Sequence, residues 1–311
     1  RSTLFPYTTL FRSDRYFTPF LAPKHKSGFS SKELNDILPE HNQGMEVIPQ
    51  ILTSDPEDFL DTAVKLKEYG YTEVNLNLGC PSGTVAAKGK GAGFLKDTEK
   101  LARFLGEVSE GMERENLHFS IKTRVGVESE EEFQTLLGLY NQCPLTELII
   151  HPRVLKDFYK YNVRMNAFKE GFEKSRHSVC YNGDIFRRKD YDRLVKEYPD
   201  LDKIMMGRGI MMNPFLMEEI ADGTSQKVSG KMSDARKADR LEKFHRLLCD
   251  GYTHVMSGDR PVLFKMKELW GFLIHSCPEE EKLMKKIRKA QHLAEYERVV
   301  SELFCRMREH E

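Results

Sequence analysis

The sequence predicts an α/β fold, a (β/α)8 TIM barrel with its first strand missing or replaced, followed by a small C-terminal helical bundle. Short apolar, β-prone segments alternate with helical patterns up to Ala221, and no strand pattern returns after that residue. Near-continuously apolar strands that alternate with helices are typical of a parallel sheet covered on both faces. A doubly wound sheet is the alternative that the same periodicity allows.

Seven segments have the composition of buried strands, one fewer than the barrel requires. They are Tyr16–Leu21, Val47–Leu52, Glu73–Leu78, Phe119–Thr123, Glu147–His151, Ser178–Tyr181 and Lys203–Met206. Helical patterns lie between them, at Pro56–Tyr69, Asp97–Glu110, Ser129–Asn141, Arg188–Glu197 and Asn213–Ala221. Asp55 before Pro56 is a typical helix start, because the carboxylate caps free N–H groups and proline fits the first turn.

The two ends of the chain differ from the strand–helix region. Residues 3–13 resemble the conceptual translation of a sequencing-adapter oligonucleotide, so we expect residues 1–13 to be artificial and the natural start to be missing. We expect a barrel domain over 14–221, a polar linker over 222–234 and a helical domain over 235–311. The helices expected there are Ala235–Met256, Pro261–Ile274, Pro278–Ala290 and Leu293–Arg308.

Composition narrows the class of protein without naming a partner. The 48 basic and 48 acidic residues balance, so net charge neither indicates nor excludes nucleic acid. Six widely spaced cysteines show no zinc-ligand spacing, which favours free thiols in a reducing compartment. No apolar run is long enough to cross a bilayer. We therefore expect a cytoplasmic protein with no membrane segment and no metal. We also expect a monomer, although composition does not bear on the oligomeric state.

Barrel enzymes place their functional groups at the carboxyl ends of the strands. One such end carries Cys80 on a Gly/Pro turn, followed by a glycine-dense loop that can approach a flat ligand. The alternative for a lone cysteine is a small buried hydrophobic side chain. Lys122 follows another strand, and an inward lysine favours an anionic neighbour.

Further polar groups follow the other strands. Gln50 can donate and accept hydrogen bonds, and His151 ends an apolar strand, where a satisfied core histidine is the alternative. The last two strands end in the segments Asn182-Gly183-Asp184 and Gly207-Arg208-Gly209. Barrels commonly bind phosphate at this place, through glycine N–H groups, a helix start and a cation such as Arg208.

The segment Asn77-Leu78-Gly79-Cys80-Pro81-Ser82, followed by Val85 and Gly91-Ala92-Gly93-Phe94-Leu95, resembles the active-site signature of the tRNA-dihydrouridine synthases. The resemblance extends from about Tyr16 to the C-terminus, although the family's Ala-Pro-Met first strand has no counterpart. It implies that Cys80 is the proton donor. It also implies FMN binding by Gln50, Lys122, His151, Asn182, Gly183, Asp184, Gly207 and Arg208.

The implied reaction is reduction of the C5=C6 bond of uridine in tRNA. NADPH would reduce FMN, flavin N5 would pass hydride to C6, and Cys80 would protonate C5. Residues 235–311 would bind tRNA through basic groups such as Lys265, Lys267 and the run Lys282–Lys289. One alternative is an FMN-dependent dehydrogenase of a free pyrimidine, similar to dihydroorotate dehydrogenase, which has no need of a basic tail. Another is a non-catalytic RNA-binding scaffold, which has no need of Cys80, Lys122 and a phosphate site together.

Overall fold

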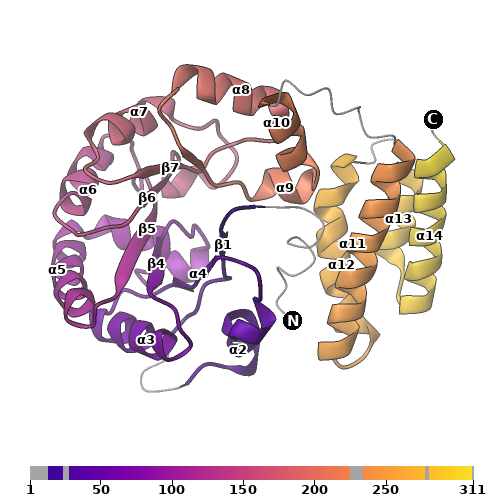
Figure 1. Ribbon diagram of the computed structural model, residues 1–311, viewed down its shortest axis with the longest axis horizontal. Helices are drawn as coiled ribbons and strands as arrows, with labels where there is room; N and C mark the ends of the chain where they lie inside the picture. The colour runs from indigo at the N-terminus through magenta and orange to yellow at the C-terminus, as the bar shows by residue number, and fades with distance from the viewer. Residues whose placement is uncertain (1–12, 24–27, 225–233, 277–279, 310–311) are drawn as a thin grey trace.

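The computed structural model describes residues 13–23, 28–224, 234–276 and 280–309, and Figure 1 shows a ring of strands and helices beside a separate group of helices. The strands are β1 (Tyr16–Phe17), β2 (Val47–Ile48), β3 (Gln50–Ile51), β4 (Glu73–Leu78), β5 (His118–Arg124), β6 (Leu148–His151), β7 (Val179–Tyr181) and β8 (Lys203–Ile204). All neighbouring strands are parallel, in the order β1-β2 and β3-β4-β5-β6-β7-β8. The predicted barrel is confirmed.

The helices of this region are α2 (Ser31–Ile37), α3 (Pro56–Glu68), α4 (Gly83–Ala86), α5 (Thr98–Arg114), α6 (Glu132–Tyr140), α7 (Met165–Lys174), α8 (Arg188–Glu197), α9 (Arg208–Met212) and α10 (Leu216–Thr224). Short 3-10 helices are η1 (Pro39–His41), η2 (Gly91–Lys96) and η3 (Leu155–Asp157). Helices α3, α5, α6, α7 and α8 follow one another around the strands (Figure 1). Their apolar faces and the strands share one buried cluster, in which the Phe59 ring meets Phe104 and Phe119 edge-on.

The ring of strands is not continuous. Leu21 bridges to Ile51, so β1 and the segment after it run along β2 and β3. Within the described residues no strand pairing joins β8 to β1. That a first strand is missing or replaced stays a prediction, because residues 1–12 lie outside the described residues. The artificial segment predicted at residues 1–13 lies, apart from Ser13, outside the described residues, so that prediction stays untested.

Several helix bounds differ from the predicted ones for local reasons. Helix α6 begins at Glu132 rather than Ser129, because the Glu132 carboxylate accepts the N–H groups of Val127, Glu128 and Ser129 at 2.9, 2.8 and 2.9 Å. The carboxylate thereby holds those residues as a loop before the helix. Helix α3 starts at Pro56 as predicted, with Asp55 capping the N–H of Asp58. Helices α2, α4 and α7 are additional to the predicted ones.

The C-terminal region contains α11 (Asp234–Val255), α12 (Asp259–Leu273), the 3-10 helix η4 (Ile274–Ser276), α13 (Glu281–Lys289) and α14 (Leu293–Glu309). These helices share a second buried cluster that also includes Phe215, which precedes α10. The predicted linker is shorter at both ends, because α10 reaches Thr224 and α11 begins at Asp234. The division into domains otherwise stays a prediction.

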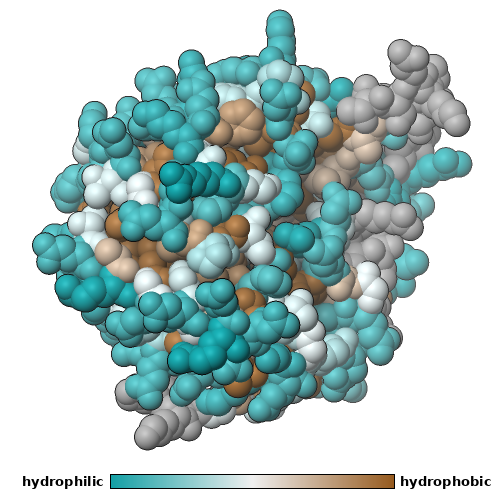
Figure 2. Space-filling view, turned by 60° about the vertical axis from the view of Figure 1, so that its left-hand side comes forward, coloured by the Kyte–Doolittle hydropathy of each residue, from teal (hydrophilic) through white to brown (hydrophobic). Residues whose placement is uncertain are grey.

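A buried polar group sits at the centre of the helical bundle. Trp270 Nε1 donates to the Tyr296 hydroxyl at 2.8 Å, and that hydroxyl lies 2.6 Å from His245 Nε2. Burial lowers the pKa of His245 to about 3, so its neutral ring can accept the Tyr296 proton. The outer surface over the barrel helices is mostly hydrophilic, with small apolar patches between polar side chains (Figure 2).

Candidate active site

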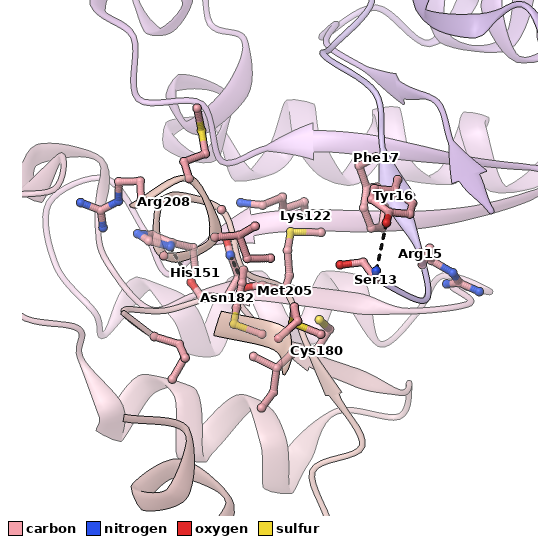
Figure 3. A pocket seen from close by; sticks show the side chains of 18 of the residues that line it. Ser13, Arg15, Tyr16, Phe17, Lys122, His151, Cys180, Asn182, Met205 and Arg208 are labelled. Atoms are coloured by element: carbon pink, nitrogen blue, oxygen red, sulfur yellow. Dashed lines mark hydrogen bonds between the residues drawn. The ribbon is translucent and has the colours of Figure 1, made fainter. Parts of the chain in front are cut away.

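A cavity of about 1000 Å³ lies inside the ring of strands, beside the interruption between β1 and β8. Its wall comes from β1, β5, β6, β7, β8 and α9, and α12 contributes Lys265 and Leu269. Figure 3 shows Lys122 in the middle of this wall, with Arg208 and His151 on one side and Tyr16 on the other. The cavity therefore joins the barrel to the helical bundle.

The structure brings together seven of the eight residues that the sequence predicts for the cofactor. Parallel strands end at the same edge of a sheet, so side chains distant in sequence meet there. The seven that line the cavity are Lys122, His151, Asn182, Gly183, Asp184, Gly207 and Arg208. Gln50 and Cys80 lie outside the cavity lining and are linked to it through neighbouring groups.

Lys122 is a cation in an unusual environment. Its side chain projects from β5, and within the described residues no hydrogen bond or ion pair reaches its ammonium group. Burial, with the charge of Arg124 as second cause, lowers the pKa of Lys122 to about 8. A desolvated ammonium without an acceptor is unfavourable unless a ligand supplies one. Among the candidate site residues, Lys122 is thus the one whose environment most favours binding of an electron-rich ligand.

His151 is held by protein groups at both ring nitrogens. Its Nδ1 lies 2.6 Å from the carbonyl oxygen of Asn182, and its Nε2 lies 3.4 Å from Arg153 Nη1. Burial, followed by the neighbouring cations with Lys122 first among them, lowers the pKa of His151 to about 2. The neutral ring therefore donates from Nδ1 and accepts at Nε2. Donation to a ligand carbonyl would require a second proton on the ring.

Asp184 connects the loops after β6, β7 and β8. It accepts two bonds from Arg153, one at 3.0 Å, and a third at 2.7 Å from Arg208 Nη2. The Arg208 guanidinium lies 4.3 Å from the centre of the Tyr159 ring and 5.4 Å from that of Phe186. Asp184 therefore orients two cations rather than facing a ligand by itself.

Asn182 and the two predicted glycines have separable roles. The Asn182 amide donates to the carbonyl of Met205 at 2.8 Å and so ties β7 to β8. A Cβ at Gly183 would lie 1.9 Å from the Tyr181 hydroxyl, which means that packing alone demands glycine there. A Cβ at Gly207 would meet no atom within 4 Å. Gly207 therefore borders open cavity space that a bound group can enter.

A chain of amides connects Gln50 to the Cys80 turn. Asn77 Nδ2 donates to Gln50 Oε1 at 2.6 Å, and Gln50 Nε2 donates to Asn75 Oδ1 at 2.8 Å. Asn77 Oδ1 in turn accepts the N–H groups of Gly79 and Cys80, at 3.0 and 2.9 Å. Gln50 is thus engaged with the barrel interior, and its predicted contact with a cofactor stays a prediction.

The Cys80 turn runs directly beside Lys122. A Cβ placed at Gly79 would lie 3.7 Å from Lys122 Nζ, and Cys80 is among the groups that act on the pKa of Lys122. The Cys80 thiol is free and partly exposed, so the alternative of a fully buried hydrophobic side chain is wrong. Cys143, Cys180, Cys249 and Cys305 are also free thiols, and Cys277 lies outside the described residues.

Two of the glycines after Cys80 serve the protein's own packing. Gly91 has φ +56°, and a Cβ there would lie 2.8 Å from the Cys80 carbonyl oxygen. A Cβ at Gly93 would lie 2.4 Å from the carbonyl oxygen of Ala86. Gly91 and Gly93 thus let η2 pack tightly against the Cys80 turn and α4, whereas a Cβ at Gly83 or Gly89 would meet no atom within 4 Å, so the approach of this loop to a flat ligand stays a prediction.

Two buried arginines and one tyrosine complete the site beyond the predicted residues. Arg124 donates to the carbonyl groups of Gly79, Val154 and Phe158 at 3.0, 2.9 and 2.9 Å, which joins the Cys80 turn to the loop after β6. Arg153 holds Asp184, and Tyr159 covers Arg208. The sequence could have indicated both arginines as site residues, because they lie at the ends of strands. No local sequence pattern distinguishes Tyr159 as a site residue.

Comparison with known families identifies the group. The family model described as "Dihydrouridine synthase (Dus)" matches residues 16–306. This chain belongs to the dihydrouridine synthase family. The Dus chain contains no group of three or more potential metal ligands within its described residues, and none of its described helices is long and apolar enough to cross a membrane.

Curated relatives carry matching names. "Probable tRNA-dihydrouridine synthase" of Staphylococcus aureus (strain COL) is 30% identical over 217 residues, covering 67% of this chain and 64% of the relative. The Staphylococcus epidermidis protein of the same name is 29% identical over 248 residues, covering 75% of this chain and 74% of the relative. This Dus chain thus spans somewhat less than two thirds of the first relative's length.

A solved structure supports the fold. The chain titled "X-structure of a variant of NCR from zymomonas mobilis" has a TM-score of 0.50 and 12% sequence identity, and the match covers 72% of this Dus chain and 81% of that chain. At this identity the similarity concerns the α/β barrel alone.

Proposed function

We propose that this protein is an FMN-dependent tRNA-dihydrouridine synthase, which reduces the C5=C6 bond of uridines in tRNA with NADPH as reductant. Family membership supports the reaction class, and the cavity at the strand ends supports the location of the site. The proposal includes tRNA as substrate and a monomer as the active form. Because its substrate is tRNA, we expect the protein in the cytoplasm.

The observation that carries the proposal is Lys122. Its ammonium group lies in the wall of the large cavity, its pKa is lowered to about 8, and within the described residues it has no acceptor. An electron-rich ring edge or an anion in the cavity would supply that acceptor. A flavin offers such an edge, and charge that develops on the reduced ring would be stabilised by the cation.

The residues present fit FMN at the opposite end of the cavity as well. Arg208 carries a guanidinium at the start of α9, and Gly207 leaves open space beside it. Asp184 uses one Arg208 nitrogen, so the other N–H groups can bind a phosphate. Lys122 would hold the ring and Arg208 the phosphate, while Asn182, His151 and Asp184 would position the wall between them.

The chemistry divides between cofactor and chain. Bound FMN would supply hydride to C6 of the uracil after reduction by NADPH. Negative charge then develops at C5, and Cys80, on the turn beside Lys122, would donate the proton that C5 requires. Asn77 holds this turn through the N–H groups of Gly79 and Cys80, which fixes the backbone that carries the thiol.

We propose that the helical bundle binds the body of the tRNA. Lys282, Arg288 and Lys289 on α13 are exposed, and within the described residues none of them forms an ion pair. Lys285 and Lys286 are paired with Glu281 and Glu302, at 3.0 and 3.8 Å. Lys267 donates to the carbonyl of Ala290 at 2.5 Å, so its role is to cap the end of α13.

The test is a separation of two half-reactions. Anaerobic addition of NADPH to the FMN-loaded protein should bleach the flavin absorbance, and subsequent addition of unmodified tRNA should restore it with formation of dihydrouridine. Bleaching without reoxidation by tRNA would contradict tRNA as the substrate. A full-length protein that binds no FMN would contradict the flavin site.

A further inference from the structure

The loop after β6 exposes aromatic rings beside the cavity. We call residues 154–164 the aromatic loop. Its three rings Phe158, Tyr159 and Tyr161 are 45%, 50% and 64% exposed. Among the described residues they make up half of the large hydrophobic side chains that are exposed, the others being Phe20, Val255 and Phe264. Exposed aromatic rings concentrated within four residues are typical of a surface that binds another molecule.

Two buried arginines hold the backbone of the aromatic loop through hydrogen bonds to its carbonyl groups. Arg124 donates to the carbonyls of Val154 and Phe158, each at 2.9 Å, and Arg153 Nε donates to the carbonyl of Tyr161 at 2.7 Å. Arg124 and Arg153 are only 1% and 2% exposed. These bonds fix the loop's conformation before any ligand arrives, so an interaction there does not have to order the chain.

The conformation held in this way is a strained one. Phe158 has φ +49° and ψ −102°, a region that bulky side chains rarely adopt. Backbone conformations of this kind cluster at ligand-binding sites. Here Arg124 and Arg153 hold the strained backbone in place while the ring stays in solvent, where a ligand can reach it.

The loop's position relates that use to the substrate cavity. Tyr159 lines the cavity and covers Arg208, and its ring meets His151 edge-on at 5.9 Å. Phe158 and Tyr161 flank Tyr159 in the chain but lie outside the cavity lining. Lys160, exposed between them, adds a positive charge. Rings with an interleaved cation suit single-stranded nucleic acid, because bases stack and phosphates attract the lysine.

We propose that Phe158 and Tyr161 stack on the bases of the nucleotides that flank the target uridine, while Lys160 contacts a phosphate between them. The inference rests on the proposed function, since it takes RNA as the substrate. Extruding one uridine from a folded RNA unstacks its neighbours. Two preorganised rings on the loop that borders the cavity would replace that lost stacking, whatever the neighbouring bases are.

The experiment compares two double variants of the FMN-loaded protein. In Phe158→Leu/Tyr161→Leu both rings are lost but apolar volume is kept, and in the control Phe158→Tyr/Tyr161→Phe both rings are kept. The leucine variant should raise the Kd for tRNA by about tenfold or more, as expected for loss of base stacking. The control should bind as the wild type does. Flavin content and flavin reduction by NADPH should be unchanged in both.

Two further measurements identify stacking. The leucine variant should leave the salt dependence of tRNA binding unchanged, whereas Lys160→Gln should lower its slope by roughly 0.7–0.9. A heptanucleotide with a central uridine should lose affinity for the wild type when its two flanking bases are removed as abasic sites. The leucine variant should not distinguish the two oligonucleotides, because its rings are already absent.

Three outcomes would overturn the inference. They are wild-type tRNA affinity in the leucine variant, an equal loss in the ring-keeping control, and a change in self-association, measured by sedimentation, in place of a change in RNA affinity. Failure of the proposed function is recognised separately, because it would leave the wild type unable to form dihydrouridine whatever the affinity of these variants.

Discussion

At the residue scale, the centre of the site is a set of positive charges without enough acceptors. Lys122, Arg124 and Arg153 lie close enough that each of them lowers the pKa of His151. Asp184 compensates Arg153, and main-chain carbonyl groups surround Arg124. Lys122 has neither kind of compensation within the described residues. The site thus contains a cation whose interactions, as we propose, a ligand completes.

Lys122→Met should therefore stabilise the flavin-free protein while abolishing flavin binding. The folded-state pKa of about 8 lies below the ordinary value of 10.5, so folding disfavours the charged form. The penalty is fully present below pH 8 and disappears as pH rises toward 10.5, so wild-type stability should increase over that window. We expect a gain of roughly 1–3 kcal/mol at pH 7, measured by urea unfolding.

Lys203→Met is the matched control, because Lys203 also lines the cavity but pairs with Glu147 at 2.9 Å. That substitution should not stabilise the protein, since it leaves the buried Glu147 carboxylate unpaired. Equal stability changes in the two variants would contradict the special environment of Lys122.

Cys80→Ala should separate proton donation from flavin chemistry. The substitution removes only a thiol on a turn that is fixed by Asn77, so FMN content and reduction by NADPH should remain at wild-type levels. Dihydrouridine formation should fall by roughly 10²–10⁴-fold, as expected for loss of a general acid. Stopped-flow absorbance separates the two steps, and wild-type reoxidation by tRNA would exclude the role given to Cys80.

At the scale of elements, α13 presents a basic face to solvent, while Leu283, Met284 and Ile287 bury its other face. Lys282→Gln/Arg288→Gln/Lys289→Gln should weaken tRNA binding and reduce its salt dependence, because fewer counterions are released. The control is Lys189→Gln/Lys196→Gln on α8, which also removes exposed lysines. Filter binding at two salt concentrations decides, and equal effects of both variants would show a nonspecific effect of charge.

The sequence predicts elements well where the determining contacts are local. Helix α3 begins at Pro56 because Asp55 caps it, and both signals are adjacent in the chain. The predicted start of α6 is wrong, because the Glu132 carboxylate accepts three N–H groups of the preceding loop. Glu130 and Glu131 lie next to it, and the sequence does not show which of these acids accepts the bonds. Strand β4 has the predicted bounds Glu73–Leu78, because its run of β-prone apolar residues is itself a local signal.

The site was predicted less completely, for a physical reason. Strand ends identified which side chains converge, and seven of eight do line the cavity. Their hydrogen-bond partners come from distant segments, so Gln50 proved to be engaged with Asn75 and Asn77. The neutral state of His151 likewise depends on cations that only the fold brings together. Roles that depend on tertiary contacts cannot be read from local pattern.

At the scale of the whole molecule, the cavity extends from the interior of the barrel to the bundle, since Tyr252, Lys265 and Leu269 help to line it. A ligand there should stabilise both parts together. FMN at a hundred times its Kd should add about 2.7 kcal/mol and raise the melting temperature by several degrees in a single transition. Riboflavin, which lacks the phosphate, should bind more weakly and stabilise less.

Arg208→Ala should remove most of the difference between FMN and riboflavin, because Arg208 is the cation expected to bind the phosphate. Scanning calorimetry with either ligand measures this difference.

The same calorimetry tests the single transition expected for the wild type. Two separate transitions, of which only one responds to FMN, would contradict a site shared by barrel and bundle.

The most direct test of the central claim is mass spectrometry of nucleosides from a defined reaction. FMN-loaded protein, NADPH and unmodified tRNA should yield a nucleoside two mass units heavier than uridine, and omission of NADPH should abolish it. Flavin reduction by NADPH without any such nucleoside, on tRNA that is shown to be bound, would contradict the assignment of this protein as a tRNA-dihydrouridine synthase.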